Sequence, residues 1–176
     1  VEFNLPGKHN VLNAVAALAM ANNFGVSLQV IAKALLSFKG VHRRFSYRIK
    51  SKNLVLIDDY AHHPTEINAV VSSVREMYPA QKVLAVFQPH LFSRTRDFAN
   101  EFAESLSRFD EVILLDIYPA REMPIQGITS EWLMNKMTLK NKKLSSKTEL
   151  IHNIKQSNAV IKVVIGAGDI GEMVVD

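Results

Sequence analysis

The segment LVLIDDYAHHPTEINAVVSSVREMY, residues 54–78, decides the fold of this 176-residue chain. It opens with the apolar run Leu54–Ile57, which has the length of a buried strand. Pro64, a residue favoured in the first turn of a helix, then begins a helical pattern. The apolar residues of that pattern fall on one helical face: Ile67, Val70, Val71, Val74 and Met77. A buried strand followed at once by an amphipathic helix predicts one unit of a parallel α/β sheet.

The same alternation of strand and helix continues to the end of the chain. Further strands are expected at Lys82–Phe87, Glu111–Leu115 and Val160–Ile165. Helices are expected around Phe98, Phe102, Leu106 and Phe109, near Thr129–Met137, near Thr148–Ser157, and from Asp169. The phenylalanines of the first helix and Trp132 are assigned to the core. The predicted fold class is therefore α/β, with a mostly parallel sheet covered by helices on both faces.

A helical segment precedes this α/β pattern. Val1–Leu5 is expected to be the end of a strand, and the turn at Pro6-Gly7 leads into a first helix. Ser27 is expected to cap a second helix, which stops before Gly40. Two helices and one strand are too little for a domain. We therefore expect residues 1–41 to be the tail of another domain and residues 42–176, beginning with an extended stretch at 43–49, to form the α/β domain.

Composition narrows the function classes. The chain has no cysteine, which excludes disulfides, thiolate metal sites and a cysteine nucleophile, and favours a reducing cytoplasm. Its apolar runs are about six residues long, far short of the roughly 20 needed for a membrane helix. The formal net charge is +4, but the densest basic stretch, residues 136–147, lacks interleaved aromatics. It is expected to be a solvated face, so neither nucleic acid nor membrane is an expected partner, whereas anionic small molecules are.

Polar clusters follow the predicted strands at the point where each one ends. They are Asp58–His63, Gln88-Pro89-His90 with Arg94 and Arg96, Asp116–Glu122, and Gly166–Asp169. Because ligands of parallel sheets bind beyond the carboxyl ends of the strands, we expect these clusters to share one edge and to form a site. The last cluster is assigned to close packing rather than to catalysis.

Three kinds of function are compatible with these clusters. Asp59, His62, His63 and His90 are side chains that a metal-dependent phosphoester hydrolase could use. Neighbouring residues of an extended chain point in opposite directions, so only one of Asp58 and Asp59 is expected to face the cleft, and no metal ligands are assigned. A non-catalytic anion-binding module is the second possibility. A ligase is the third, which rests on the resemblance given below. An arginine of the linker, Arg43 or Arg44, could hold a phosphate by a bidentate bond.

Four ordered motifs resemble the Mur ligase family. They are PGKHNVLNA at residues 6–14, GVHRRF at 40–45, DDYAHHPTE at 58–66, and FQPH at 87–90 with SRTR at 93–96. The doubled histidine and the FQPH segment resemble the branch of the family that adds L-alanine. The resemblance implies three domains, of which this chain would hold the tail of the ATP-binding domain and the whole Rossmann-like C-terminal domain. The family's Gly-rich ATP loop has no match, because the sequence contains no Gly-Lys-Ser or Gly-Lys-Thr.

What the resemblance implies is ATP-driven joining of L-alanine to UDP-N-acetylmuramate through an acyl phosphate, in peptidoglycan precursor synthesis. The cofactors would be ATP and Mg²⁺, the main Mg²⁺ ligands would lie outside this chain, and the chain would be inactive without the missing domains. The residues expected to bind ATP are His9, Asn10, Asn13 and Arg44. The residues expected to be catalytic are Arg44, Asp59 and His62, and those expected to hold substrate are Tyr60, His62, His63, His90 and Arg94. Leu91 stands where many members have arginine, which leaves a murein-peptide recycling ligase as an alternative.

Overall fold

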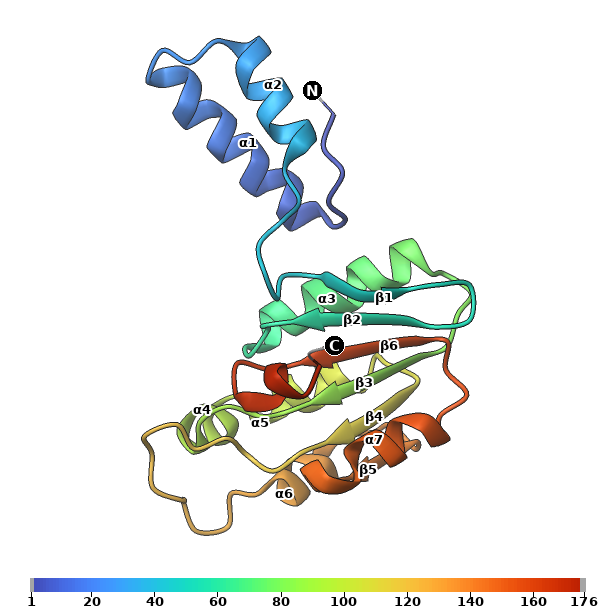
Figure 1. Cartoon of the computed structure of the whole chain (residues 1–176). Coiled ribbons are helices and arrows are strands. Elements are labelled where there is room, and N and C mark those ends of the chain that lie inside the picture. Colours follow the sequence, from blue (N-terminus) through green and yellow to red (C-terminus); the bar gives the residue numbers. More distant parts are fainter. Residues whose placement is uncertain (1, 175–176) are drawn as a thin grey trace.

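The computed structural model describes residues 2–174 as a helical hairpin followed by an α/β body (Figure 1). The hairpin consists of α1 (Lys8–Asn23) and α2 (Leu28–Ser37). The strands of the body are β1 (Ser46–Lys50), β2 (Val55–Asp59), β3 (Val83–Phe87), β4 (Glu111–Leu114), β5 (Lys142–Leu144) and β6 (Ile161–Ile165). Its helices are α3 (Pro64–Met77), α4 (Phe92–Asp97), α5 (Ala99–Leu106), α6 (Ser130–Lys136), α7 (Lys147–Gln156) and the 3₁₀ helix η1 (Asp169–Val174).

The six strands form one sheet in the order β1-β2-β6-β3-β4-β5. Only β1 runs antiparallel to its neighbour, and the other four pairs are parallel. The carboxyl ends of β2, β6, β3, β4 and β5 therefore lie at the same edge. The predicted α/β fold with a mostly parallel sheet is confirmed.

Helices cover both faces of the sheet, as predicted. One hydrophobic core lies between the sheet and the helices α3, α5 and α6, and includes Ile67, Phe102 and Leu133. A smaller core lies on the opposite face, beneath α7 and η1, around Leu150 and Ile170. All five residues of β3 are buried, as the position of a central parallel strand requires.

The helical hairpin stands away from the sheet (Figure 1). Asn10 is the buried residue of α1 and Ile31 that of α2, whereas Leu12 on α1 is 58% exposed and Val30 on α2 is 57% exposed. Ser27 precedes α2 as predicted, but its hydroxyl makes no capping hydrogen bond, so the predicted side-chain cap is wrong. The hairpin thus leaves much of its apolar surface uncovered.

Two local predictions differ from the structure near the ends of elements. Residues 2–5 are not a strand, because no strand of the sheet lies beside them, and Val1 lies outside the described residues. The stretch expected at 43–49 becomes extended only at Ser46, because Arg43 and Phe45 adopt positive φ angles of 57° and 48°. The linker therefore turns sharply before it enters the sheet.

Two further predictions fail inside the body. The helix expected through Phe98 and Phe109 is broken at Phe98, whose φ of −115° separates α4 from α5, and α5 ends at Leu106. The basic stretch is not only a solvated face, because β5 lies within it and pairs with β4. Lys142 of β5 donates a hydrogen bond to Met137 O, and Lys143 donates one to Asn153 Oδ1. Their ammonium groups therefore bind neighbouring segments at the edge of the sheet.

Candidate functional site

The polar residues that follow β2 and β3 meet at the carboxyl edge of the sheet. The ring centroids of His62, beyond β2, and His90, beyond β3, are 6.2 Å apart. Arg94, on α4, places Nη1 at 3.4 Å from His90 Nδ1. The expected convergence of His62, His90 and Arg94 is confirmed, and it creates a cationic corner between two strand ends.

Four rings form a continuous series along this edge, which we call the ring row: Tyr60, His62, His90 and Tyr118. The successive centroid distances are 5.4, 6.2 and 5.6 Å. Tyr118 follows β4 and stacks on His90 with an interplanar angle of 23°. Tyr60 is 45% exposed, so the row is open to solvent at its β2 end. A ligand lying on the row would meet imidazole nitrogens and aromatic faces.

The surroundings of His90 favour its neutral imidazole form. Burial lowers its pKa, and the neighbouring Arg94 and His62 lower it further, while Glu122 opposes this change. A neutral ring beside a guanidinium leaves Arg94 as the permanent positive charge of this corner. The corner is therefore suited to bind an anionic group, such as a carboxylate or a phosphate, at neutral pH.

His63 is used differently from His62. Its Nδ1 accepts the backbone N–H of Thr65 at 3.4 Å, and the carboxylate of Glu66 accepts the backbone N–H groups of both histidines. This capping box fixes the start of α3. The His63 ring packs against Phe98 at 4.6 Å and belongs to no pair of the ring row. The structure thus brings His63 to the site's supporting helix rather than to the ring row.

The two acids at the end of β2 have separate partners. Asp58 is fully buried and forms ion pairs with Arg43 at 3.2 Å and Arg48 at 3.0 Å. Asp59 lies beside a cavity, and its carboxylate accepts the backbone N–H groups of Phe45 at 2.7 Å and Ala61 at 2.8 Å. As predicted from the alternation of an extended chain, only Asp59 reaches the open side.

The environment of Asp59 favours its protonated form. Burial, with a smaller effect of the nearby carboxylates of Asp58 and Glu66, raises its pKa to about 6, although the two backbone N–H donors oppose the change. Asp59 therefore ties the linker to β2 and titrates close to neutral pH.

The two linker arginines point to different partners. Arg43 is committed to the sheet, where it donates to Asp58 and to the carbonyl oxygen of Gly166. The side chain of Arg44 makes no hydrogen bond or ion pair with the residues that the structure describes, and it lines two adjoining cavities. The expectation that a linker guanidinium is free to meet a phosphate therefore falls on Arg44 and not on Arg43.

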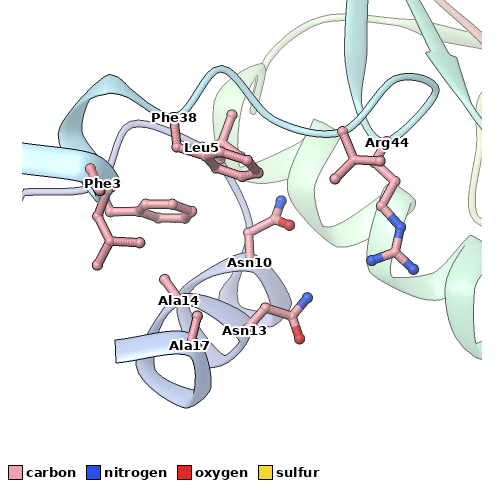
Figure 2. Close-up of a pocket in the computed structure, with 11 residues that line it drawn as sticks. Phe3, Leu5, Asn10, Asn13, Ala14, Ala17, Phe38 and Arg44 are labelled. Atoms are coloured by element: carbon pink, nitrogen blue, oxygen red, sulfur yellow. The ribbon is translucent and has the colours of Figure 1, made fainter. Parts of the chain in front are cut away.

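The first cavity has a volume of about 430 Å³ and lies between the hairpin and the linker. Figure 2 shows the amides of Asn10 and Asn13 between a group of apolar side chains and Arg44. The apolar lining comes from Phe3, Leu5, Ala14, Ala17, Leu35 and Phe38. Asn10 Nδ2 already donates to Pro6 O at 2.6 Å, which leaves Asn13 as the freer of the two amides. An apolar slot with two amides suits a flat heterocycle.

The second cavity, of about 300 Å³, continues from the first towards the sheet. The two cavities share Asn13 and Arg44, and the second adds His9, Asp59 and Tyr60. Burial lowers the pKa of His9, and Arg44 lowers it further. The residues expected to bind nucleotide and those expected at the strand end are thus joined through Arg44.

The sequence placed the stretch Asp116–Glu122 at this edge, but neither Tyr118 nor Glu122 was assigned to the site individually. Tyr118 donates its N–H to Pro89 O at 2.8 Å and accepts the N–H of Leu91 at 2.9 Å, so it grips both neighbours of His90. Glu122 accepts the N–H of Ser93 at 2.9 Å and also its hydroxyl, and these bonds lower its pKa. Both residues lie in the polar stretch after β4, and its position at a strand end was the available sign.

Leu91 occupies an unusual backbone position between His90 and α4. Its φ is 73°, a value that non-glycine residues rarely adopt. The Leu91 carbonyl oxygen accepts the hydroxyl of Thr95 at 2.8 Å. The chain therefore keeps a fixed turn here, with an apolar side chain directly after His90.

No helix among residues 2–174 has the length and apolar character of a membrane span. Within the same residues, no three His, Asp or Glu side chains are grouped so that they could hold a metal ion. Asp59, the acid nearest the cavities, has both carboxylate oxygens engaged by backbone N–H groups.

Comparison with known proteins gives consistent matches over the whole chain. It is 67% identical over 176 residues to the UDP-N-acetylmuramate–L-alanine ligase of Flavobacterium psychrophilum, and 65% identical over 174 residues to that of Christiangramia forsetii. These matches cover 100% and 99% of this chain but 39% and 38% of those relatives. The crystal structure of UDP-N-acetylmuramate-alanine ligase MurC from Thermotoga maritima matches with a TM-score of 0.80 and 29% identity, over 98% of this chain and 37% of that one.

The family comparison covers the α/β body. Residues 43–174 match the family described as "Mur ligase, glutamate ligase domain". This range begins at Arg43 and contains the sheet, the ring row and Arg94. The chain belongs to the Mur ligase family.

Proposed function

We propose that this chain is the C-terminal part of an ATP-dependent ligase that joins L-alanine to UDP-N-acetylmuramate in peptidoglycan precursor synthesis. The observation that carries the proposal is the position of Arg44, which lines both the cavity of the hairpin and the cavity at the end of β2. The 67% identity to an enzyme of that name, over the full length of this chain, supports the choice of substrates.

The family uses ATP, and the first cavity has the character that an adenine ring needs. Its apolar walls would cover the faces of the ring, and the amide of Asn13 would pair with a polar edge. Asn10 would hold the turn at Pro6 and present its oxygen. From this position the phosphates of ATP would extend towards Arg44 and the second cavity, where His9 lies.

The reaction requires two displacements. A carboxylate oxygen of UDP-N-acetylmuramate attacks the γ-phosphorus, the bond to ADP breaks, and an acyl phosphate forms. The amine of L-alanine then attacks the acyl carbon, phosphate leaves with its bonding electrons, and the amine loses a proton. Catalysis of this type depends mainly on placing the reactants and neutralising charge.

The residues of this chain would share these tasks by position. Arg44 would neutralise the transferred phosphoryl group, and the corner of His62, His90 and Arg94 would hold the amino acid by its carboxylate. Tyr60 would close the open end of the ring row, and His63 would act through α3. Asp59 would keep the linker aligned with β2 when the site closes. Mg²⁺ would neutralise phosphate charge, but residues 2–174 provide no grouped ligands for it, so its protein ligands are proposed in the part of the relatives that this chain does not cover.

A division of the chain at about residue 41 is part of the same proposal. Residues 1–41 would complete the ATP-binding domain of a longer protein, and residues 42–176 would form the C-terminal ligase domain. The family match from residue 43 supports this boundary. The chain spans only 39% of its relative's length, so we expect the chain by itself to be inactive.

The test is phosphate release by the longer ligase that carries this chain, with ATP, UDP-N-acetylmuramate and a panel of amino acids and peptides. We expect release to depend on UDP-N-acetylmuramate and to be fastest with L-alanine. A preference for a peptide would instead indicate a murein-peptide recycling ligase. The apolar Leu91 beside His90 keeps this alternative open, because it stands where the resemblance implies an arginine. Release that depends on neither substrate would contradict the ligase proposal.

A further inference from the structure

The linker arginine that faces away from the cavities makes more contacts with the sheet than a surface side chain needs. Arg43 Nε donates to Asp58 Oδ1 at 3.2 Å, and Nη2 donates to Gly166 O at 2.6 Å. Its guanidinium carbon lies 5.1 Å from the centre of the Tyr60 ring. One side chain thus joins the end of β2, the end of β6 and the first ring of the ring row.

The backbone of Arg43 contributes to the same junction. Its carbonyl oxygen accepts the N–H of Tyr60 at 2.6 Å, so the linker is bonded to the site loop directly. The positive φ of Arg43 turns the chain, and Arg44, the next residue, lines the cavities. The orientation of Arg44 is therefore coupled to the way in which Arg43 is held.

The C-terminal 3₁₀ helix leaves room for this arrangement. A Cβ atom at Gly171 would overlap the guanidinium of Arg43, so the two residues lie in direct contact. A glycine at position 171 is compatible with the observed guanidinium position, and alanine is not. The guanidinium is thus enclosed between β2, β6 and η1.

We propose that Arg43 is a positioning residue that locks the linker onto the sheet, and so fixes Arg44 and Tyr60 relative to each other. This inference rests on the proposed ligase function, since it assigns Arg43 a part in that reaction without contact with substrate. It predicts that Arg44 moves with the sheet, and that any hinge between hairpin and body lies before Arg43.

Arg48 provides a matched control. It also donates one hydrogen bond to buried Asp58, at 3.0 Å, and its side chain is 21% exposed compared with 14% for Arg43. Its other bond goes to His42, and it makes no hydrogen bond to Gly166 or Tyr60. Arg48→Ala therefore removes a comparable ion pair and leaves the contacts of Arg43 in place.

The first measurement is hydrogen exchange of the Tyr60 amide in the 176-residue chain, which does not depend on ligase activity. Arg43→Ala and Gly171→Ala should accelerate exchange at Tyr60 by roughly tenfold or more, and Arg48→Ala by less than about twofold. Gly171→Ala keeps Arg43, Arg48 and Asp58, so it displaces the Arg43 guanidinium without removing a charge. It therefore separates the position of this guanidinium from the general loss of stability that follows removal of a buried ion pair. Equal acceleration in Arg43→Ala and Arg48→Ala, or none in either, would overturn the lock.

The second measurement is steady-state kinetics of the longer ligase. Arg43→Ala should lower kcat by roughly tenfold with the KM for UDP-N-acetylmuramate within about twofold, and Arg43→Lys should recover part of the loss. Arg48→Ala should keep the wild-type kcat. Faster exchange at Tyr60 with an unchanged kcat would refute the role in the reaction, whereas an inactive wild type would refute the proposed function and leave the lock to be judged by exchange.

Discussion

Arg44 is the residue at which the nucleotide side and the strand-end side of the site meet. We predict that Arg44→Ala in the longer ligase lowers phosphate release by roughly 10- to 100-fold, the effect of losing one or two charge-assisted hydrogen bonds to phosphate. Binding of UDP-N-acetylmuramate, measured by calorimetry, should be unchanged. Arg44→Lys keeps the charge but not the planar guanidinium, so its rate of phosphate release should lie between those of the wild type and Arg44→Ala. A variant with full turnover would contradict the phosphate role.

The raised pKa of Asp59 predicts how the stability of the fold changes with pH. Its pKa is raised from 3.8 to about 6, so the folded chain binds this proton more tightly than the unfolded chain does. Its favourable contribution is therefore complete below about pH 4 and is lost as the pH rises through about 6. As the pH rises across this window, the wild type should lose up to roughly 3 kcal/mol of unfolding free energy relative to the Asp59→Asn variant.

Urea denaturation of both proteins from pH 4 to pH 7 measures that shift. Asparagine has one oxygen acceptor in place of two, so the variant also loses a bond to Phe45 or Ala61, but this loss does not vary with pH. If the difference in unfolding free energy between the two proteins stays constant from pH 4 to pH 7, the pKa of Asp59 is not raised into this range.

At the scale of residues, sequence reasoning found the side chains at strand ends but not their partners. The alternation of an extended chain predicts that Asp58 and Asp59 face opposite ways, and they do. Nothing local predicts that Arg43 and Arg48 converge on Asp58, because these contacts depend on β1 folding back beside β2. The role of Tyr118 was not predicted for the same reason, since its stacking on His90 joins residues that follow different strands.

At the scale of elements, a lysine of β6 caps the carboxyl end of α7. Lys162 of β6 is 7% exposed, and its Nζ donates to Ile154 O at 2.6 Å and to Ser157 O at 3.0 Å. These carbonyl groups lie at the carboxyl end of α7, where the helix dipole also favours a cation. Lys162→Met should lower the unfolding free energy by about 1–3 kcal/mol, because it leaves two acceptors without their donor.

Urea denaturation of the variant checks this, with Lys155→Met as the control. Lys155 lies in the last turn of the same helix but is exposed, so its replacement should change the unfolding free energy by less than about 0.5 kcal/mol. If the two variants lose equal stability, the cap on α7 is not the source of the effect.

The elements that sequence patterns predicted well are those with a continuous apolar run or a one-sided helical face, such as β3 and α3. The short strand β5 was hidden because its two lysines use their charges at the sheet edge. Helix α4 was hidden because Phe92–Asp97 has no apolar period, and its start depends on the positive φ of Leu91. β5 pairs with β4, and Leu91 donates its N–H to Tyr118 O, so both elements depend on residues distant in sequence.

At the scale of the whole molecule, the chain consists of two bodies that differ in how much apolar surface they bury. The sheet has a core on each face, whereas the hairpin exposes Val11, Leu12 and Val15 at 50%, 58% and 56%. The hairpin touches the body near the start of α1, where a Cβ at Gly7 would overlap the hydroxyl of Ser73 on α3. This geometry leaves room for movement between the bodies and keeps Arg44 at their junction.

The difference in burial predicts that the hairpin unfolds before the sheet. Short helices in water depend on packing of an apolar face for stability, and α1 and α2 each bury a single residue. In the 176-residue chain, amides of α1 and α2 should exchange at least about 100-fold faster than those of β3 and β6, and urea should remove helical signal at a lower concentration than it exposes Trp132. Because Trp132 lies on α6 and packs against the core of the sheet, its fluorescence reports the α/β body alone. A single transition seen equally by circular dichroism and by Trp132 fluorescence would mean that hairpin and sheet are one cooperative unit, with coupling through Gly7 and Ser73 stronger than their few contacts suggest.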